Sequence, residues 1–178
     1  MKTDKQLYQI FTANPDWLFE LTGIVSPGHS RMLSVSLKAL NQTSDGLIPP
    51  DDSTQPLTIV EFQLQPDDTI YSRTVTEMAL IQQEYQMRDI RGLILFRHSS
   101  HDPDTSPWNR VVESYDFPSI MERLESDQPK RPLVAVFKPI LEPDPDTLEQ
   151  RTVEYFRTIR DSPLEQPVRS TLTNVFIS

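Results

Sequence analysis

Residues 57–67 read LTIVEFQLQPD, and this segment decides the fold because it has the pattern of a buried strand that ends in polar side chains. Successive side chains of an extended strand point to opposite faces of the sheet. The apolar side chains therefore share one face and the polar ones share the other: Val60, Phe62 and Leu64 against Glu61, Gln63 and Gln65. Because Leu57 and Ile59 precede Glu61 on its own face, we expect burial on both sides until the chain reaches Glu61.

Glu61 pairs with a second acid to form a candidate metal site. A carboxylate at the end of a buried strand is unfavourable unless it is solvated, paired or bound to a metal. Asp45 lies sixteen positions earlier and is followed by Gly46. Mg²⁺ or Mn²⁺ accepts oxygen ligands and keeps several waters, so the two carboxylates suffice together with a substrate phosphate. This spacing leaves a second interpretation open, in which Glu61 and Gln63 lie on the solvent face of an antiparallel sheet and Asp45-Gly46 is a turn.

Gln63 follows Glu61 on the same face of the predicted strand, about 7 Å further along. An amide both donates and accepts hydrogen bonds, so Gln63 can orient an attacking water. It cannot act as a base, and a bound metal would have to acidify the water by itself.

Composition limits the classes of function. The chain has 178 residues, a formal net charge of −9 and no cysteine, which excludes disulfides, thiolate metal sites and cysteine nucleophiles. Negative charge disfavours general nucleic-acid binding, although a local basic groove can coexist with it. No apolar run approaches the roughly 18 residues that a membrane span needs, and no signal peptide is recognisable, so we expect no membrane association and a cytoplasmic location.

The pattern of apolar residues predicts an α/β domain with a mixed central β-sheet flanked by helices. Strands are predicted at 31–40, 46–48, 57–65, 92–96, 111–115 and 133–141, and helices at 5–13, 15–22, 69–87, 119–124, 147–160 and from 167. Asn14 and Asp146 are the expected N-terminal caps of two helices, and Gly23 the expected helix stop. We expect one domain over 1–178, with a core over about 1–145 and a C-terminal helical segment over 146–178.

Other chemistry-bearing residues have weaker patterns. His98 and His101 have a spacing that can bind Zn²⁺, but they fall in a polar loop without further ligands, so a solvated loop is the preferred interpretation. Lys138 lies late in the predicted strand 133–141 and would supply a cation to the edge that carries Glu61. A surface lysine is the preferred alternative.

Several segments in order resemble a known family. They are residues 1–11 (MKTDKQLYQIF), 18–21 (LFEL), Asp45-Gly46-Leu47 with Pro49, 60–68 (VEFQLQPDD) followed by Tyr71, Arg73, Glu77 and Tyr85, and 163–176. They look like a cyanobacterial family that groups with the recombination-promoting, transposase-like nucleases of the PD-(D/E)XK superfamily. The resemblance spans nearly the whole chain, and its most specific part is the string from Glu61 to Asp67.

This resemblance implies a restriction-endonuclease-like core in which Asp45 and Glu61 hold Mg²⁺ and Gln63 takes the place usually held by lysine. Glu20 matches a helical glutamate of the family and would be an accessory metal ligand. The implied function is a metal-dependent DNA endonuclease, with DNA as partner and a homodimer as a possible assembly. The alternative is a catalytically degenerate nuclease fold that acts as a DNA- or protein-interaction module, in keeping with Gln63 and the net charge.

Overall fold

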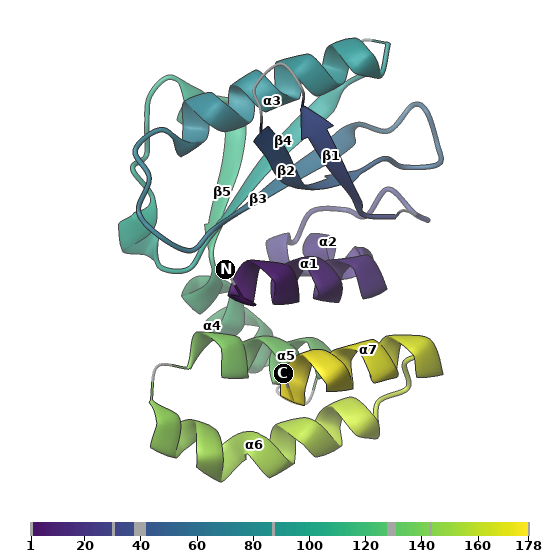
Figure 1. Cartoon of the computed structure of the whole chain (residues 1–178), viewed down its shortest axis with the longest axis vertical. Coiled ribbons are helices and arrows are strands. Elements are labelled where there is room, and N and C mark those ends of the chain that lie inside the picture. The colour runs from purple at the N-terminus through teal and green to yellow at the C-terminus, as the bar shows by residue number, and fades with distance from the viewer. Residues whose placement is uncertain are drawn as a thin grey trace.

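A five-stranded mixed sheet lies between α3 (Ile70–Glu84) on one face and the remaining α-helices on the other (Figure 1). The computed structural model describes residues 2–29, 31–37, 42–86, 88–127, 131–142 and 144–177. The strands lie in the order β1 (Leu33–Leu37), β2 (Gln42–Ile48), β3 (Leu57–Gln63), β4 (Ile90–Phe96) and β5 (Val112–Asp116). β1, β2 and β3 pair antiparallel, whereas β3, β4 and β5 pair parallel. The strand that carries Glu61 is therefore the middle strand of the sheet.

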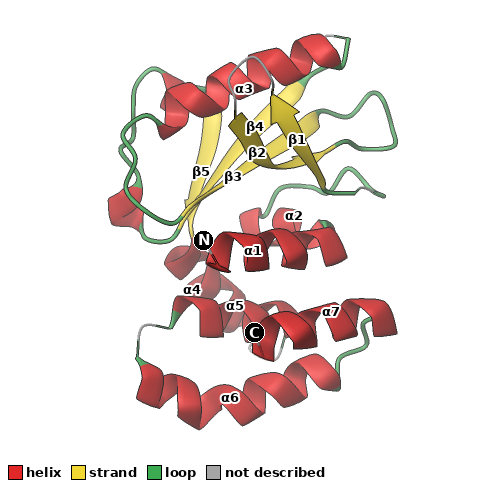
Figure 2. Cartoon of the chain, in the orientation of Figure 1, coloured by secondary structure: helices red, strands yellow, loops and turns green. Residues whose placement is uncertain are grey.

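Helices cover both faces of this sheet (Figure 2). α3 crosses one face and connects the parallel strands β3 and β4. The other face is covered by α1 (Lys2–Ala13) and α2 (Asp16–Thr22), with a helical layer beyond them. That layer contains α4 (Phe117–Asp127), α5 (Pro132–Leu141), α6 (Pro145–Arg160) and α7 (Gln166–Ile177). The predicted α/β class with a mixed, helix-flanked sheet is confirmed, and the arrangement is consistent with a restriction-endonuclease-like core.

The two faces of β3 contribute to two separate apolar cores. Val60 and Phe62 belong to the core beneath α1, where the ring of Phe62 stacks on Phe11 with centroids 5.3 Å apart. Leu57 and Ile59 belong to the core beneath α3. The expected burial on both sides is confirmed, because every residue of β3 before Gln63 is buried. Glu61 thus lies on the α3 face, at the end of an otherwise apolar row.

The strand predicted at 133–141 is wrong, because these residues form helix α5. Five consecutive apolar residues, 133–137, indicate burial without deciding between a strand and a buried helix. Pro132 favours a helix, since proline is well suited to a helix's first turn. All five side chains are buried because α5 lies inside the helical layer, with Phe137 in contact with the rings of Phe11 and Phe117.

Helix ends agree only in part with the sequence. Gly23 ends α2 with φ of 76°, as expected for a left-handed helix stop. Asn14 does not cap α2, because the position before the helix is held by Pro15 and no side-chain cap bond forms. The cap of α6 is Asp144, not Asp146, and its carboxylate accepts hydrogen bonds from the backbone N–H groups of residues 146 and 147. None of the helices in the described segments is long and apolar enough to cross a membrane.

The Asp144→Ala protein should have a lower free energy of unfolding than wild type, because two N–H groups at the start of α6 lose their partner. Urea denaturation measures the loss. Asp144→Asn keeps an acceptor oxygen and should retain most of the stability. Equal losses in the two variants would contradict this capping role.

Candidate metal centre

Asp45 and Glu61 lie opposite each other on the neighbouring strands β2 and β3, and each is bound to the backbone of the other strand. The antiparallel register pairs Gly46 with Val60 and so brings Asp45 alongside Glu61. The Phe62 N–H donates to Asp45 Oδ2 at 2.8 Å, and the Asp45 N–H donates to Glu61 Oε1 at 3.2 Å. These reciprocal bonds position both carboxylates at one place on the sheet.

The second interpretation from the sequence is contradicted for Asp45, Gly46 and Glu61. Asp45 and Gly46 lie within β2 and do not form a turn. A Cβ atom at Gly46 would displace the end of the Met32 side chain and lie 3.1 Å from Val60 Cγ1, so Gly46 sits in a tightly packed part of β2. Glu61 is only 5% exposed, so it does not lie on a solvent face.

Glu77 of α3 is a third carboxyl group at this site. It is 1% exposed and hydrogen-bonded to the Glu61 side chain, and its Oε2 atom has no hydrogen-bond partner among the described residues. The resemblance singled out Glu77, but not as a ligand. The sequence does indicate its position, since Thr74, Glu77 and Ile81 recur at helical spacing and therefore share one face of α3. All three are buried. A glutamate in that apolar row indicates a buried charge facing the sheet.

Burial and mutual repulsion make the carboxyl pair Glu61–Glu77 hold protons tightly. Burial, followed by the charges of Asp45 and Glu77, raises the pKa of Glu61 well above its usual value. Burial also raises the pKa of Glu77, although the hydrogen bond to Glu61 and the charge of Arg73 act in the opposite direction. Three acidic groups in so little water favour either bound protons or a bound cation.

Arg73 brings positive charge to the same cluster from one helical turn before Glu77. Its Nη2 atom lies 3.9 Å from Glu61 Oε2, and its Nη1 atom donates to Asp67 Oδ2 at 2.7 Å. Asp67 is held in turn by Thr69, whose N–H and hydroxyl donate to Oδ1. Burial opposes ionisation of Asp67, but the bonds from Thr69 and the charge of Arg73 outweigh it and lower the pKa of Asp67.

Gln63 and Glu20, the other two predicted site residues, have partners elsewhere. The Gln63 amide donates to the backbone carbonyl of Gln65, so its recorded bond is to its own segment. Glu20 of α2 forms an ion pair with Arg131, which directly precedes α5. In the described part of the chain, neither side chain is hydrogen-bonded or ion-paired to Asp45 or Glu61.

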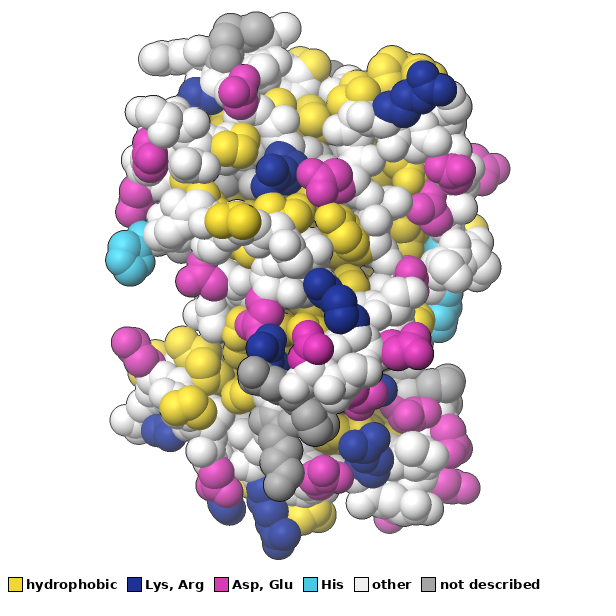
Figure 3. Space-filling model, turned by 180° about the vertical axis from the view of Figure 1, so that it is seen from behind, with side chains coloured by type: hydrophobic (Ala, Val, Ile, Leu, Met, Phe, Trp, Pro, Cys, Tyr) yellow, Lys and Arg dark blue, Asp and Glu magenta, His cyan; other side chains and the backbone are white. Residues whose placement is uncertain are grey.

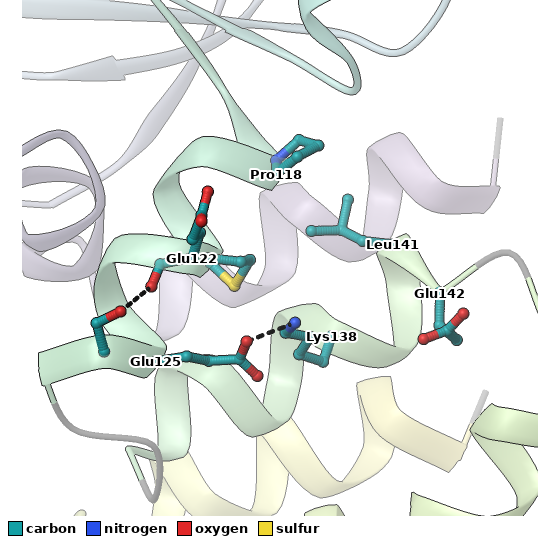
Figure 4. Close-up of a pocket in the computed structure, with 8 residues that line it drawn as sticks. Pro118, Glu122, Glu125, Lys138, Leu141 and Glu142 are labelled. Atoms are coloured by element: carbon teal, nitrogen blue, oxygen red, sulfur yellow. Dashed lines mark hydrogen bonds and ion pairs between the residues drawn. The ribbon is translucent and has the colours of Figure 1, made fainter.

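Two further candidates from the sequence lie apart from the Asp45–Glu61 pair. Lys138 lies on α5, not on a strand, and pairs with Glu125 at 2.7 Å. Both line a pocket of about 480 Å³ between α4 and α5, on the other side of the sheet from α3 (Figure 4). The rings of His98 and His101 touch edge to face in the 99–101 turn.

Two carboxylates are the ligand set that the described segments offer to a hard cation. Within them, no group of three or more acidic or histidine side chains surrounds one ion position. Asp45 and Glu61 fit a magnesium ion that retains waters and takes its remaining ligands from a substrate. The unpartnered Oε2 of Glu77 and the raised pKa of Glu61 fit a site whose negative charge is neutralised on cation binding.

Comparison with known proteins gives a family without an assigned activity. Neither a curated protein nor a solved structure matches the chain. One family model, described as "Protein of unknown function (DUF2887)", matches residues 3–176. Because this match covers nearly the entire chain, the protein belongs to the DUF2887 family.

Proposed function

We propose that this protein is a magnesium- or manganese-dependent DNA endonuclease, similar to transposase-like, recombination-promoting nucleases, and that it hydrolyses phosphodiester bonds at the Asp45–Glu61 pair. The observation that carries the proposal is the reciprocal bonding of the two carboxylates across β2 and β3. A fold gains no stability from crowding buried carboxylates, so a cluster that raises the pKa of Glu61 is better explained by function.

Each residue has a defined part in this reaction. Asp45 and Glu61 would hold the cation, which when bound would supply Lewis-acid polarisation of a phosphoryl oxygen and a lower pKa for a coordinated water. Gln63 would orient that water by hydrogen bonding. An amide cannot remove the proton of the water, so Gln63 does not act as a base. The Phe62 N–H keeps Asp45 in place throughout. Glu20 enters only as an accessory ligand, and it would first have to leave Arg131.

DNA must approach an acidic protein, so local charge matters more than net charge. On the face shown in Figure 3, basic and acidic side chains of the described residues are interspersed. Among the described residues, Arg73 forms an ion pair with Glu61 at 3.9 Å and so brings positive charge to the proposed site. A homodimer would place two such sites on the two strands of a duplex. The lack of cysteine fits a reducing cytoplasm.

Cleavage of supercoiled plasmid tests the proposal. The wild type should nick or linearise plasmid in Mg²⁺ or Mn²⁺ and be inactive in EDTA. Asp45→Asn should reduce the rate by at least about 100-fold, because the several kcal/mol of charge stabilisation by the metal is lost. Activity in EDTA, or equal rates for the two proteins, would contradict the proposed site.

A degenerate nuclease fold is the second candidate, and the hydrogen bond of Gln63 to its own segment favours it. Such a module would bind DNA or a protein without turnover. It predicts a folded wild type that fails to cleave in either metal, whereas the nuclease proposal predicts metal-dependent products.

A further inference from the structure

With a divalent ion and substrate at the Asp45–Glu61 pair, negative charge would remain in excess, and a further positive side chain would reduce it. Two ionised carboxylates cancel the two positive charges of a divalent ion. A phosphodiester brings one negative charge, and an attacking hydroxide brings another. Electrostatic stabilisation of a transition state needs donors that are already aimed at the developing charge. Gln63 carries no charge, so the positive side chain would be another residue.

We propose that Arg73 is the phosphate-binding residue of this site and supplies the positive charge that Gln63 lacks. This inference rests on the proposed function, because it assigns Arg73 to the substrate of the same centre. Arg73 lies on α3 four residues before Glu77, so the two side chains project from one face of the helix toward Glu61.

The guanidinium group is anchored but not saturated. Nη1 donates to Asp67 at 2.7 Å, which is its single side-chain hydrogen bond among the described residues. Nη2 forms an ion pair with Glu61 Oε2 at 3.9 Å, beyond hydrogen-bond distance, so within the described segments its N–H groups make no hydrogen bond. The Arg73 side chain is 29% exposed, whereas the side chain of Glu61 is 6% exposed. A ligand can therefore reach Arg73 from solvent while Glu61 stays covered.

Arginine suits this role for chemical reasons. Its planar fork presents parallel donors that match two phosphate oxygens, and it stays protonated at any physiological pH. It binds and stabilises charge without exchanging protons. Asp67 acts as a positioning residue, because it fixes one edge of the fork and leaves the remaining donors for the phosphate.

Matched variants separate phosphate binding from metal binding. Arg73→Gln and Arg73→Lys are compared with Arg91→Gln, which makes the same charge change on β4. Arg91 is 33% exposed and pairs with Glu113, away from the acid cluster. The probe is a fluorescein-labelled DNA duplex, bound in Ca²⁺ and cleaved in Mg²⁺, and Mn²⁺ affinity is measured on the same proteins.

Arg73→Gln should weaken duplex binding about tenfold and flatten its salt dependence by about one counterion. It should slow cleavage by a further 10²-fold or so, at the scale of one lost transition-state donor. Mn²⁺ affinity should stay within about twofold of wild type, since no metal ligand is changed. Arg73→Lys should recover part of the duplex affinity, because charge remains but the fork is lost. Arg91→Gln should match wild type in every measurement.

The inference is overturned if Arg73→Gln binds and cleaves duplex as Arg91→Gln does. If the wild type cleaves in that case, the proposed nuclease function is still supported. A wild type that binds duplex through Arg73 but never cleaves supports the phosphate-binding role and overturns the nuclease function. If Arg73→Gln fails to fold, the comparison of Arg73→Lys with wild type decides, and equal cleavage rates overturn the inference.

Discussion

The Glu61→Gln protein should be more stable than wild type and nearly inactive. Glutamine keeps the shape of Glu61 and an oxygen that accepts from the Asp45 N–H, but it removes a negative charge from a buried group next to Asp45 and Glu77. Arg73 lies 3.9 Å from Glu61, but two neighbouring carboxyl groups and burial oppose the Glu61 charge, so removing that charge should raise the free energy of unfolding at pH 8. Losing a metal ligand should reduce cleavage by at least about 10²-fold.

The stability gain should depend on pH in a defined direction. The pKa of Glu61 is raised above 4.5, so the folded state binds protons more tightly than the unfolded state. The wild type therefore loses stability as pH rises above 4.5 and through the folded pKa. Glu61→Gln has no such titrating group, so its free energy of unfolding should increase relative to that of wild type from pH 5 to pH 8. Urea denaturation measures this difference.

Glu77→Gln is the matched control. It removes a second carboxyl group of raised pKa from the same cluster, so its stability relative to wild type should also increase with pH. It leaves the Asp45–Glu61 pair intact. A purely structural Glu61 would behave differently. Its replacement would then weaken the fold at pH 8 and leave cleavage unchanged, and that result would contradict a metal role.

The Phe137→Ala protein should lose about 3–5 kcal/mol of unfolding free energy. Phe137 is fully buried on α5, with ring centroids 5.5 Å from both Phe11 and Phe117. The deletion leaves a cavity where α1, α4 and α5 meet. For a chain of this length, each kcal/mol shifts the melting temperature by about 2–4 °C, so calorimetry should show a fall of roughly 6–20 °C.

Ile177→Ala is the control for this prediction. Ile177 is 69% exposed at the end of α7, and its truncation should change stability by no more than about 0.5 kcal/mol. A loss below about 1 kcal/mol for Phe137→Ala would mean that α5 does not anchor the helical layer through this ring.

The parts of the fold that have strong periodicity could be predicted. β3 and α3 follow periods of two and of about 3.6 residues, and each lies where the sequence indicates. Residues 133–137 lack such a period, because α5 is surrounded by other helices and needs no polar face. The sequence of this segment predicts burial, but it does not distinguish a strand from a helix.

The sequence predicts the candidate site only for the residues whose chemistry and spacing indicate it directly. The proximity of Asp45 and Glu61 is confirmed, whereas their metal role stays a prediction. Helical spacing indicates that Glu77 faces the sheet, but the contacts of Glu77 and Arg73 with Glu61 depend on how α3 lies across the sheet, which no local pattern specifies. The carboxylate of Glu20 is a suitable metal ligand by residue type. Its ion pair with Arg131 depends on the tertiary contact of α2 with the segment before α5, which the sequence does not show.

Binding of Mn²⁺ by wild type and by Glu61→Gln tests the central claim most directly. Titration followed by electron paramagnetic resonance counts the bound ions in the absence of DNA. We predict a Mn²⁺ site in the wild type, competed by Mg²⁺, that weakens at least about tenfold in Glu61→Gln while the variant remains folded. Unchanged affinity in a folded Glu61→Gln protein would contradict the assignment of the cation to Asp45 and Glu61.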